Sequence, residues 1–371
     1  MTRVVVAPDS FKGTVSAADA AAALAAGWRA VRPRDELVLR PMADGGEGTL
    51  DAFATTVPGA RRMPVRVRGP VGAQPDTVET HGVLLPDGTG VVELAATSGI
   101  TLLDRLQPLD AHTAGFGDAI AAALDHGVSR LLLGLGGSAS TDGGVGALAV
   151  LGARFAGASG RPIGLGNRGL RALHRVDLSP LRPVPPGGAV ILGDVTNPLL
   201  GPSGAAAVFG PQKGADAATV TVLEENLARL VRRMPSSVRP LAAVPGAGAA
   251  GGAGFGLLAW GATMGGGAAV VADAIGLPEA IRGASLVITG EGRFDGQSAA
   301  GKAPTEVAAL ARQAGVRTAL VAGAVTAEPR GFAASVALVD LAGSSAVAMT
   351  EPRRWLEAAG AQLARSVDLP G

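Results

Sequence analysis

The sequence predicts an α/β protein built on parallel sheets, and three observations lead to this. Short runs of β-branched and aliphatic residues recur along the chain, each run ends in a loop rich in Gly, Asp and Ser, and an alanine-rich helical stretch follows. This order of strand, loop and helix is typical of parallel α/β architecture. Because the chain has 371 residues, more than one average domain, we expect two α/β domains.

The N-terminal part shows the pattern most clearly. Residues 4–7 form the first expected strand, and Ser16 with Asp19 makes a capping box that opens a helix reaching about Ala30. Residues 37–40 give a second strand, and the segment 45–49 leads into another helix.

The middle of the chain differs, because residues 65–94 alternate between apolar and polar as antiparallel or edge strands do. A helix over 117–125 and a strand over 131–133 follow. Parallel α/β rhythm resumes with strands at 285–288, 318–321 and 335–339 and a helix over 304–315. We therefore predict one doubly wound domain from residues 1–70 and 285–371, with residues 71–284 inserted as a second α/β domain.

Composition excludes several function classes. The chain has no cysteine, which rules out disulfides, thiolate metal sites and cysteine nucleophiles. Its 32 Lys and Arg nearly balance 31 Asp and Glu without a basic cluster, so the electrostatic footprint of a nucleic-acid binder is missing. The expected partner is a small molecule. The sequence is compatible with a homo-oligomer but does not determine the oligomeric state.

Location follows from two apolar stretches. The run at 4–7 is too short for the apolar core of a signal peptide, so we expect a cytoplasmic protein. Residues 240–272 carry no charge and are long enough to span a bilayer. They are mostly glycine and alanine, which transfer weakly into a membrane, so we interpret them as a loop and a buried helix and expect no membrane contact.

Glycine motifs are weak evidence for nucleotide binding in this chain, because 56 of its residues are glycine and a GxGxxG pattern is expected by chance. One such motif, at residues 246–251, follows a proline rather than a strand. A variant at Gly134, Gly136 and Ala139 does follow a strand, but no acidic residue lies between Asp142 and Asp177, where a ribose-binding acid belongs. This argues against a NAD-dependent dehydrogenase.

Residues 296–303 match the spacing of a P-loop, yet Ala303 replaces its Ser or Thr, and several residues separate the segment from the preceding strand. A true P-loop is therefore not expected. Lys302 still precedes a helix N-terminus, where backbone N–H groups favour anions, so it is a candidate phosphate ligand; a solvated surface lysine is the alternative.

Carboxylates in small-residue loops after strands are the stronger signal, because α/β sheets bind ligands there. They are Asp9, Asp44, Glu47, Asp194, Glu291 and Asp295. Phosphoryl transfer uses carboxylates to hold Mg²⁺ or to accept the proton of the attacking hydroxyl, while Lys, Arg and backbone N–H groups neutralise phosphates. For each acid alone, helix capping or turn formation is an equally good explanation, and Asp142 is the weakest candidate for that reason.

The histidines, by contrast, indicate no catalysis. His81, His112, His126 and His174 lie outside every glycine loop and lack metal-ligand spacing, so we interpret them as structural or solvated.

As a set, the loops resemble the successive signatures of bacterial glycerate kinases, of the type that makes the 2-phosphate, in that family's order and over about residues 4–324. The segments are APDSFKG at 7–13, MADGGEGT at 42–49, GLGGS at 134–138, DVTNPLLG at 194–201, FGPQKG at 209–214 and the stretch 290–302.

This resemblance implies an ATP- and Mg²⁺-dependent kinase that phosphorylates D-glycerate in glyoxylate or serine-derived carbon metabolism. It also implies a flavodoxin-like domain with a second α/β domain inserted in it. The 2-hydroxyl is the expected acceptor. Phosphorylation of the 3-hydroxyl and, from a different class, a non-catalytic protein that binds small anions or nucleotides remain alternatives.

The resemblance and the residue types together predict roles for individual residues. The candidates for the base, the metal carboxylates and their supporting groups are Asp194, Asp295, Asp44 and Lys12, with Asp194 and Glu291 as metal ligands. The expected substrate-binding residues are Asp9, Ser10, Glu47 and Arg293, the last because its planar fork suits the glycerate carboxylate. The expected nucleotide- and phosphate-binding residues are Gly136, Gly137, Ser138, Lys213 and Lys302.

Overall fold

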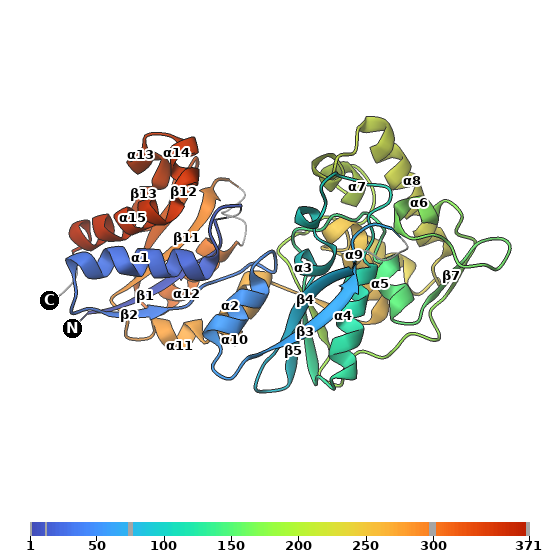
Figure 1. Ribbon diagram of the computed structural model, residues 1–371, viewed down its shortest axis with the longest axis horizontal. Helices are drawn as coiled ribbons and strands as arrows, with labels where there is room; N and C mark the ends of the chain where they lie inside the picture. The colour runs from blue at the N-terminus through green and yellow to red at the C-terminus, as the bar shows by residue number, and fades with distance from the viewer. Residues whose placement is uncertain (1, 12, 73–76, 297–301, 369–371) are drawn as a thin grey trace. The chain divides into compact units, whose positions relative to one another are not determined.

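The computed structural model describes residues 2–11, 13–72, 77–296 and 302–368, and confirms a mixed α/β fold with parallel sheets. The chain divides into two compact units (Figure 1). Unit 1 comprises Met1–Asp44, Asp51–Pro58 and Gly266–Gly371, and unit 2 comprises Gly45–Leu50 and Gly59–Gly265.

Unit 1 is built on a parallel sheet of five strands in the order β2-β1-β11-β12-β13. This is the flavodoxin-like order, with the inserted residues falling between its second and third strands. The elements are β1 (Arg3–Pro8), α1 (Ala17–Val31), β2 (Glu36–Leu39), α2 (Thr49–Thr56), α10 (Gly267–Ala274), α11 (Leu277–Ile281), β11 (Leu286–Phe294), α12 (Ala303–Gln313), β12 (Arg317–Val325), β13 (Ala334–Ala337), α13 (Leu338–Ala342), α14 (Ser345–Thr350) and α15 (Pro352–Ser366).

Helices cover both faces of this sheet. Val4 and Val6 of β1 lie in one core with α1 and α15, whereas Val5 is also fully buried and, by the alternation of a strand, points to the opposite face. There α12 packs against β1, β11 and β12 through buried residues such as Val307. The doubly wound arrangement predicted from the sequence is therefore confirmed.

Helix α1 begins as the sequence predicts, since the Asp19 N–H donates to Ser16 Oγ at 3.1 Å and Ser16 Oγ donates to Asp19 Oδ2 at 2.9 Å. The helix then packs on α15 at very short range. A Cβ at Gly27 would come within 1.8 Å of the Glu357 carbonyl oxygen, and one at Gly360 within 2.2 Å of the Leu24 carbonyl oxygen. Two glycines thus set the separation of the two helices.

Unit 2 contains a mixed sheet of six strands in the order β10-β9-β6-β5-β4-β3. Strands β5, β6, β9 and β10 are parallel, and β3 and β4 join as antiparallel strands, as the alternation over 65–94 predicts. The strands are β3 (Arg61–Arg68), β4 (Thr77–Leu84), β5 (Thr89–Glu93), β6 (Arg130–Gly134), β9 (Ala189–Leu192) and β10 (Thr263–Gly265), with β7 (Arg154–Ala156) and β8 (Arg175–Asp177) as a separate pair.

The helices of unit 2 are α3 (Ala95–Ser98), α4 (Ala114–Asp125), α5 (Val145–Val150), α6 (Gly166–Leu170), α7 (Ala205–Phe209), α8 (Ala217–Arg233) and α9 (Ala249–Trp260), with short 3₁₀ turns at Ile100–Leu102, Pro211–Lys213 and Arg239–Ala243. Its core gathers Leu131 and Leu133 of β6 with Phe116 of α4 and Leu148 of α5. In the part of the chain that the structure describes, no helix is both long and apolar enough to cross a membrane.

The units differ from the predicted domain ranges at both junctions, and the segment Gly45–Leu50, predicted in the first domain, also falls with unit 2. Residues 61–68 fall with unit 2, because β3 pairs with β4 along its whole length. Residues 266–284 fall with unit 1, because α10 and α11 pack on α12.

The close crossing of α1 and α15 yields a stability prediction. Alanine normally stabilises a helix interior relative to glycine, but Gly27→Ala places a methyl group on the Glu357 carbonyl and should lower the free energy of unfolding by about 2 kcal/mol. Urea denaturation measures this. Ala26→Leu, on the exposed side of α1, is the control and should change stability by less than about 0.5 kcal/mol. A stabilising Gly27→Ala variant would contradict the packing described here.

Candidate active site

A cavity of about 360 Å³ opens in unit 1 at the carboxyl ends of its parallel strands. Its polar lining consists of Asp9, Ser10, Thr14, Asp44, Glu291, Arg293, Asp295, Lys302 and Ser345. Asp9 and Ser10 follow β1, Asp44 follows β2, and Glu291 lies near the end of β11. The strand order reverses between β1 and β11, and open α/β sheets bind their ligands at such a switch point.

Backbone pairing fixes the first pair of polar residues. The Asp9 N–H donates to the Gly290 carbonyl at 2.8 Å, which extends the pairing of β1 with β11 by one step. Asp9 Oδ1 accepts from the Ser10 N–H at 2.6 Å. Ser10 Oγ is buried and has no hydrogen-bond partner among the described residues, so this hydroxyl is available to a ligand.

Strand β11 carries the next group. The sequence suggested that residues 290–295 form a loop, but β11 continues to Phe294, with Glu291 opposite Ala322 and Arg293 opposite Ala324 of β12. Glu291 is buried, whereas Arg293 is exposed. A strand holds both side chains more rigidly than a loop.

Lys302 lines the same cavity at the start of α12, where it occupies the N-cap position ahead of Pro304. The first backbone N–H groups of that helix favour an anion. Lys12 and most of the P-loop-like segment, residues 297–301, lie outside the described residues.

The remaining predicted carboxylates belong to unit 2. Asp194 follows β9, and the loop 134–138 follows the neighbouring parallel strand β6, so both leave the sheet at the same edge. Exposed Glu47 lies in the segment Gly45–Leu50, which Glu93 at the end of β5 anchors by accepting from the Leu50 N–H at 3.0 Å. Sequence reasoning did not assign Glu93 this role; a single acid at the end of an otherwise apolar strand was the available signal.

Glycines in these loops permit close packing. A Cβ at Gly136 would lie 2.3 Å from Gly46 Cα, and the Gly136 N–H donates to the Gly45 carbonyl at 3.1 Å. The other glycine motif behaves similarly, because a Cβ at Gly251 would lie 2.0 Å from the Ser140 carbonyl oxygen. Both GxGxxG-like patterns therefore have a packing explanation that requires no dinucleotide.

Lys213 is buried, with 3% of its surface exposed. Its ammonium donates to Ser138 Oγ at 2.9 Å and to the Ser140 carbonyl oxygen. Burial lowers the pKa of Lys213 to about 7, and the carboxylate of Asp142 opposes part of that shift. The structure thus joins two predicted phosphate ligands, Lys213 and Ser138, by a direct hydrogen bond.

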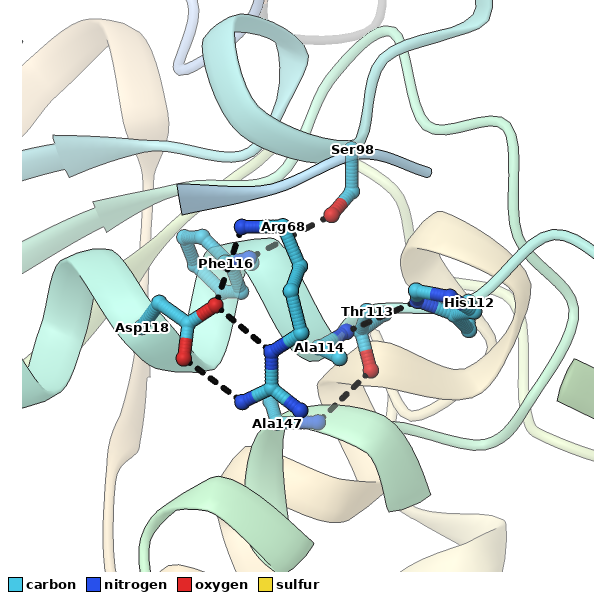
Figure 2. A network of polar contacts seen from close by, with 8 residues as sticks. All are labelled: Arg68, Ser98, His112, Thr113, Ala114, Phe116, Asp118 and Ala147. Carbon is cyan, nitrogen blue, oxygen red and sulfur yellow. Dashed lines mark hydrogen bonds and ion pairs between the residues drawn. The ribbon is translucent and has the colours of Figure 1, made fainter. Parts of the chain in front are cut away.

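Asp142, the weakest candidate, is fully buried and organises backbone. It accepts hydrogen bonds from the N–H groups of Thr113, Gly144 and Gly146 and from Thr113 Oγ1, at 2.9–3.1 Å. Figure 2 shows Thr113 Oγ1 in turn accepting from the Ala147 N–H, which ties the start of α4 to α5. The capping explanation suits Asp142.

His112 lies in the same network, where Nδ1 accepts from the Ala114 N–H at 3.3 Å (Figure 2). Its Nε2 contacts the Gly72 carbonyl at 3.0 Å, which assigns the Nε2–H tautomer. The histidine is buried in backbone contacts, as a structural role predicts.

Mg²⁺ was the metal that the sequence suggested. Among the described residues no cluster of three or more His, Cys, Asp or Glu side chains could hold a metal by itself. Mg²⁺ is usually held by only one or two carboxylates together with substrate phosphates and water. The carboxylates of Glu291 and Asp295, which line one cavity, fit that mode of binding.

Of the predicted site residues, the structure gathers Asp9, Ser10, Asp44, Glu291, Arg293, Asp295 and Lys302 around one cavity in unit 1. Asp194, Glu47, Gly136, Gly137, Ser138 and Lys213 lie in unit 2. Sequence reasoning missed the apolar part of the lining, which comes mainly from the segment 338–352.

The burial of Lys213 yields a pH prediction. The unfolded chain keeps this lysine protonated up to its ordinary pKa near 10.5, while the folded protein releases the proton near pH 7. Between these values the unfolded state binds more protons, so stability should rise with pH by up to about 1.4 kcal/mol per unit.

Lys213→Met removes this dependence. The free energy of unfolding of the wild type should therefore increase relative to that of the variant between pH 7 and pH 10. Urea denaturation at several pH values measures it. Arg233→Met, on the exposed end of α8, is the control, since guanidinium groups stay charged in this range. If the difference in free energy of unfolding between the wild type and Lys213→Met does not change with pH, the pKa of Lys213 is not lowered.

Comparison with known proteins agrees with this architecture. The model of the glycerate kinase family matches residues 4–368. A glycerate kinase of Halalkalibacterium halodurans is 42% identical over 331 residues, which cover 88% of this chain and 86% of that protein. A glycerate 2-kinase of Escherichia coli is 40% identical over 330 residues, covering 87% and 86%.

A solved structure supports the same assignment. A crystal structure assigned to glycerate kinase 2 of Salmonella typhimurium LT2 superimposes with a TM-score of 0.82 at 35% identity and covers 98% of both chains. Because the family model spans nearly the whole chain and the fold agrees throughout, the chain belongs to the glycerate kinase family, whose members are kinases.

Proposed function

We propose that this protein transfers the γ-phosphoryl group of ATP to the 2-hydroxyl of D-glycerate, giving 2-phosphoglycerate and ADP. The observation that carries the proposal is the cavity at the switch point of unit 1, where carboxylates and cationic side chains converge in a member of this family. The 40% identity to the E. coli glycerate 2-kinase favours the 2-hydroxyl. A cytoplasmic location remains a prediction from the sequence.

The reaction assigns roles to the cavity residues. The 2-hydroxyl oxygen forms the new bond to the γ-phosphorus, the bond from that phosphorus to the ADP oxygen breaks, and a carboxylate takes the hydroxyl proton. Asp295 or Asp194 is the proposed base, and Asp44 with Lys12 supports the reacting groups. Gly136, Gly137, Ser138, Lys213 and Lys302 are the proposed phosphate-binding residues.

Mg²⁺ is the proposed cofactor, with Glu291 and Asp194 as the carboxylates predicted to hold it and Asp295 as a further candidate. When bound, it would offset negative charge on the phosphates. The protein's own residues would orient the glycerate, with Ser10 Oγ as an unpartnered buried hydroxyl and Asp9 beside it.

Coupled assays test the reaction and its position together. Purified protein, D-glycerate and Mg·ATP are combined with enolase, which accepts 2-phosphoglycerate directly, with or without a mutase that converts the 3-isomer. We expect the enolase step to proceed without the mutase. Product only with the mutase would move the phosphoryl group to the 3-hydroxyl, and no ADP formation with glycerate would favour a non-catalytic binding protein.

Arg293 is the proposed ligand of the glycerate carboxylate, because it is exposed at the cavity and its planar fork suits bidentate contact. Arg293→Ala should raise KM for glycerate by roughly tenfold or more and KM for ATP much less. The control is Arg282→Ala, an exposed arginine of unit 1 that pairs with Glu279. Equal increases in KM for glycerate and KM for ATP would show that Arg293 is not a specific ligand of the glycerate carboxylate.

A further inference from the structure

The cavity in unit 1 has an apolar part that the polar chemistry above does not use. Apart from Phe11, which follows β1 beside the polar residues, it is formed by Leu338, Val339, Ala348, Met349 and Pro352, with Ser345 as the polar side chain among them. These six residues belong to the short segment that follows β13 and contains α13, α14 and the start of α15. The carboxylates and cations come instead from the ends of β1, β2 and β11 and the start of α12.

Strand order separates these two linings. Strand β13 is the edge strand, three positions from β1 in the sheet. At about 4.8 Å per strand, the two lie about 14 Å apart. Gly323 and Ala324 of the intervening β12 also line the cavity, so it is continuous across this distance. The cavity therefore suits an elongated ligand that is charged at one end and apolar at the other.

Of the two substrates of the proposed reaction, only ATP has both a charged end and a weakly hydrated end. Glycerate is small and carries a carboxylate and hydroxyl groups, so it offers no surface that an apolar lining would bind. ATP joins a planar base, whose faces are weakly hydrated, to a charged triphosphate. Apolar side chains with few polar groups are the usual lining for such a ring.

We propose that the apolar lining at residues 338–352 is the subsite for the nucleoside base of ATP. The triphosphate then extends along the carboxyl ends of the strands toward the switch point, where Lys302 lines the cavity. This inference rests on the proposed function for the identity of the nucleotide. Under this proposal unit 1 binds the base of ATP, through residues that neither the glycine motifs nor the carboxylate loops of the sequence had indicated.

Met349 provides the sharpest test. Its side chain is 61% exposed and lines the cavity, so its replacement should not disturb the core. Val347 lies two residues earlier on α14, is 42% exposed and is outside the described cavity lining, which makes Val347→Ala the matched control.

Two inhibitors separate the base from the phosphates. ADP contains both, whereas pyrophosphate contains only the phosphates. Met349→Ala should weaken inhibition by ADP roughly fivefold, and Met349→Glu more than tenfold, because apolar contact is lost and a carboxylate is added. Inhibition by pyrophosphate and KM for glycerate should change less than twofold in Met349→Ala. Val347→Ala should leave all three constants unchanged.

Other outcomes overturn the assignment. Unchanged ADP inhibition in both Met349 variants places the base elsewhere. A rise in KM for glycerate alone assigns the apolar lining to the acceptor, and equal weakening of ADP and pyrophosphate assigns it to the phosphates. Calorimetry of ADP binding keeps the test independent of turnover. If the Met349 variants bind ADP more weakly than the wild type as described, but the wild type never phosphorylates glycerate, the subsite stands and the proposed reaction fails.

Discussion

The parallel pairing of β1 with β11 is the contact on which the cavity depends. It joins Val4 to Leu286 and continues through Pro8 and Gly290, across the whole inserted part of the chain. The Thr289 hydroxyl donates to the Ala7 carbonyl at 2.9 Å in the same region. Because the two strands are parallel neighbours, their carboxyl ends carry Asp9 and Glu291 to the same edge of the sheet. No local feature of either segment could bring these carboxylates together.

Close backbone packing is the second constraint, and it explains why the glycine motifs mislead. Gly45 has a φ of 91°, and a Cβ there would lie 2.5 Å from the Leu192 carbonyl oxygen. The loops that follow β6 and β9 can approach the Gly45–Gly46 segment only because these positions lack side chains. In a chain with this much glycine, a motif defined by glycine spacing reports such contacts as readily as it reports a nucleotide.

The local elements of the fold could be predicted because their signals are local. The Ser16–Asp19 cap and the strand at 131–133 depend on nearby residues and are confirmed. The length of β11 could not be predicted, since Glu291 and Arg293 stay in the strand through pairing with β12, a contact between distant segments. Pairing with β4 also assigns residues 61–68 to the second sheet, whereas the predicted boundary at residue 70 had placed them in the first domain.

The candidate site was predictable to a similar degree. Carboxylates after strands identified four of the nine described polar residues of its lining, because parallel strands end at one edge. The apolar lining was not predictable, since the amphipathic pattern of α14 and α15 does not specify which end of the sheet they reach. The hydrogen bond from Lys213 to Ser138 joins residues 75 positions apart, and only the structure supplies it.

Charge balance in the cavity connects its two linings. Four carboxylates, those of Asp9, Asp44, Glu291 and Asp295, face two described cations, Arg293 and Lys302. Both proposed substrates are anions, so this excess of negative charge opposes their binding unless further positive charge enters with a ligand. A nucleotide that arrives with a divalent cation supplies it, as is usual in phosphoryl-transfer sites. The apolar lining acts on a part of the nucleotide that carries no charge, so its contribution to binding does not depend on that balance.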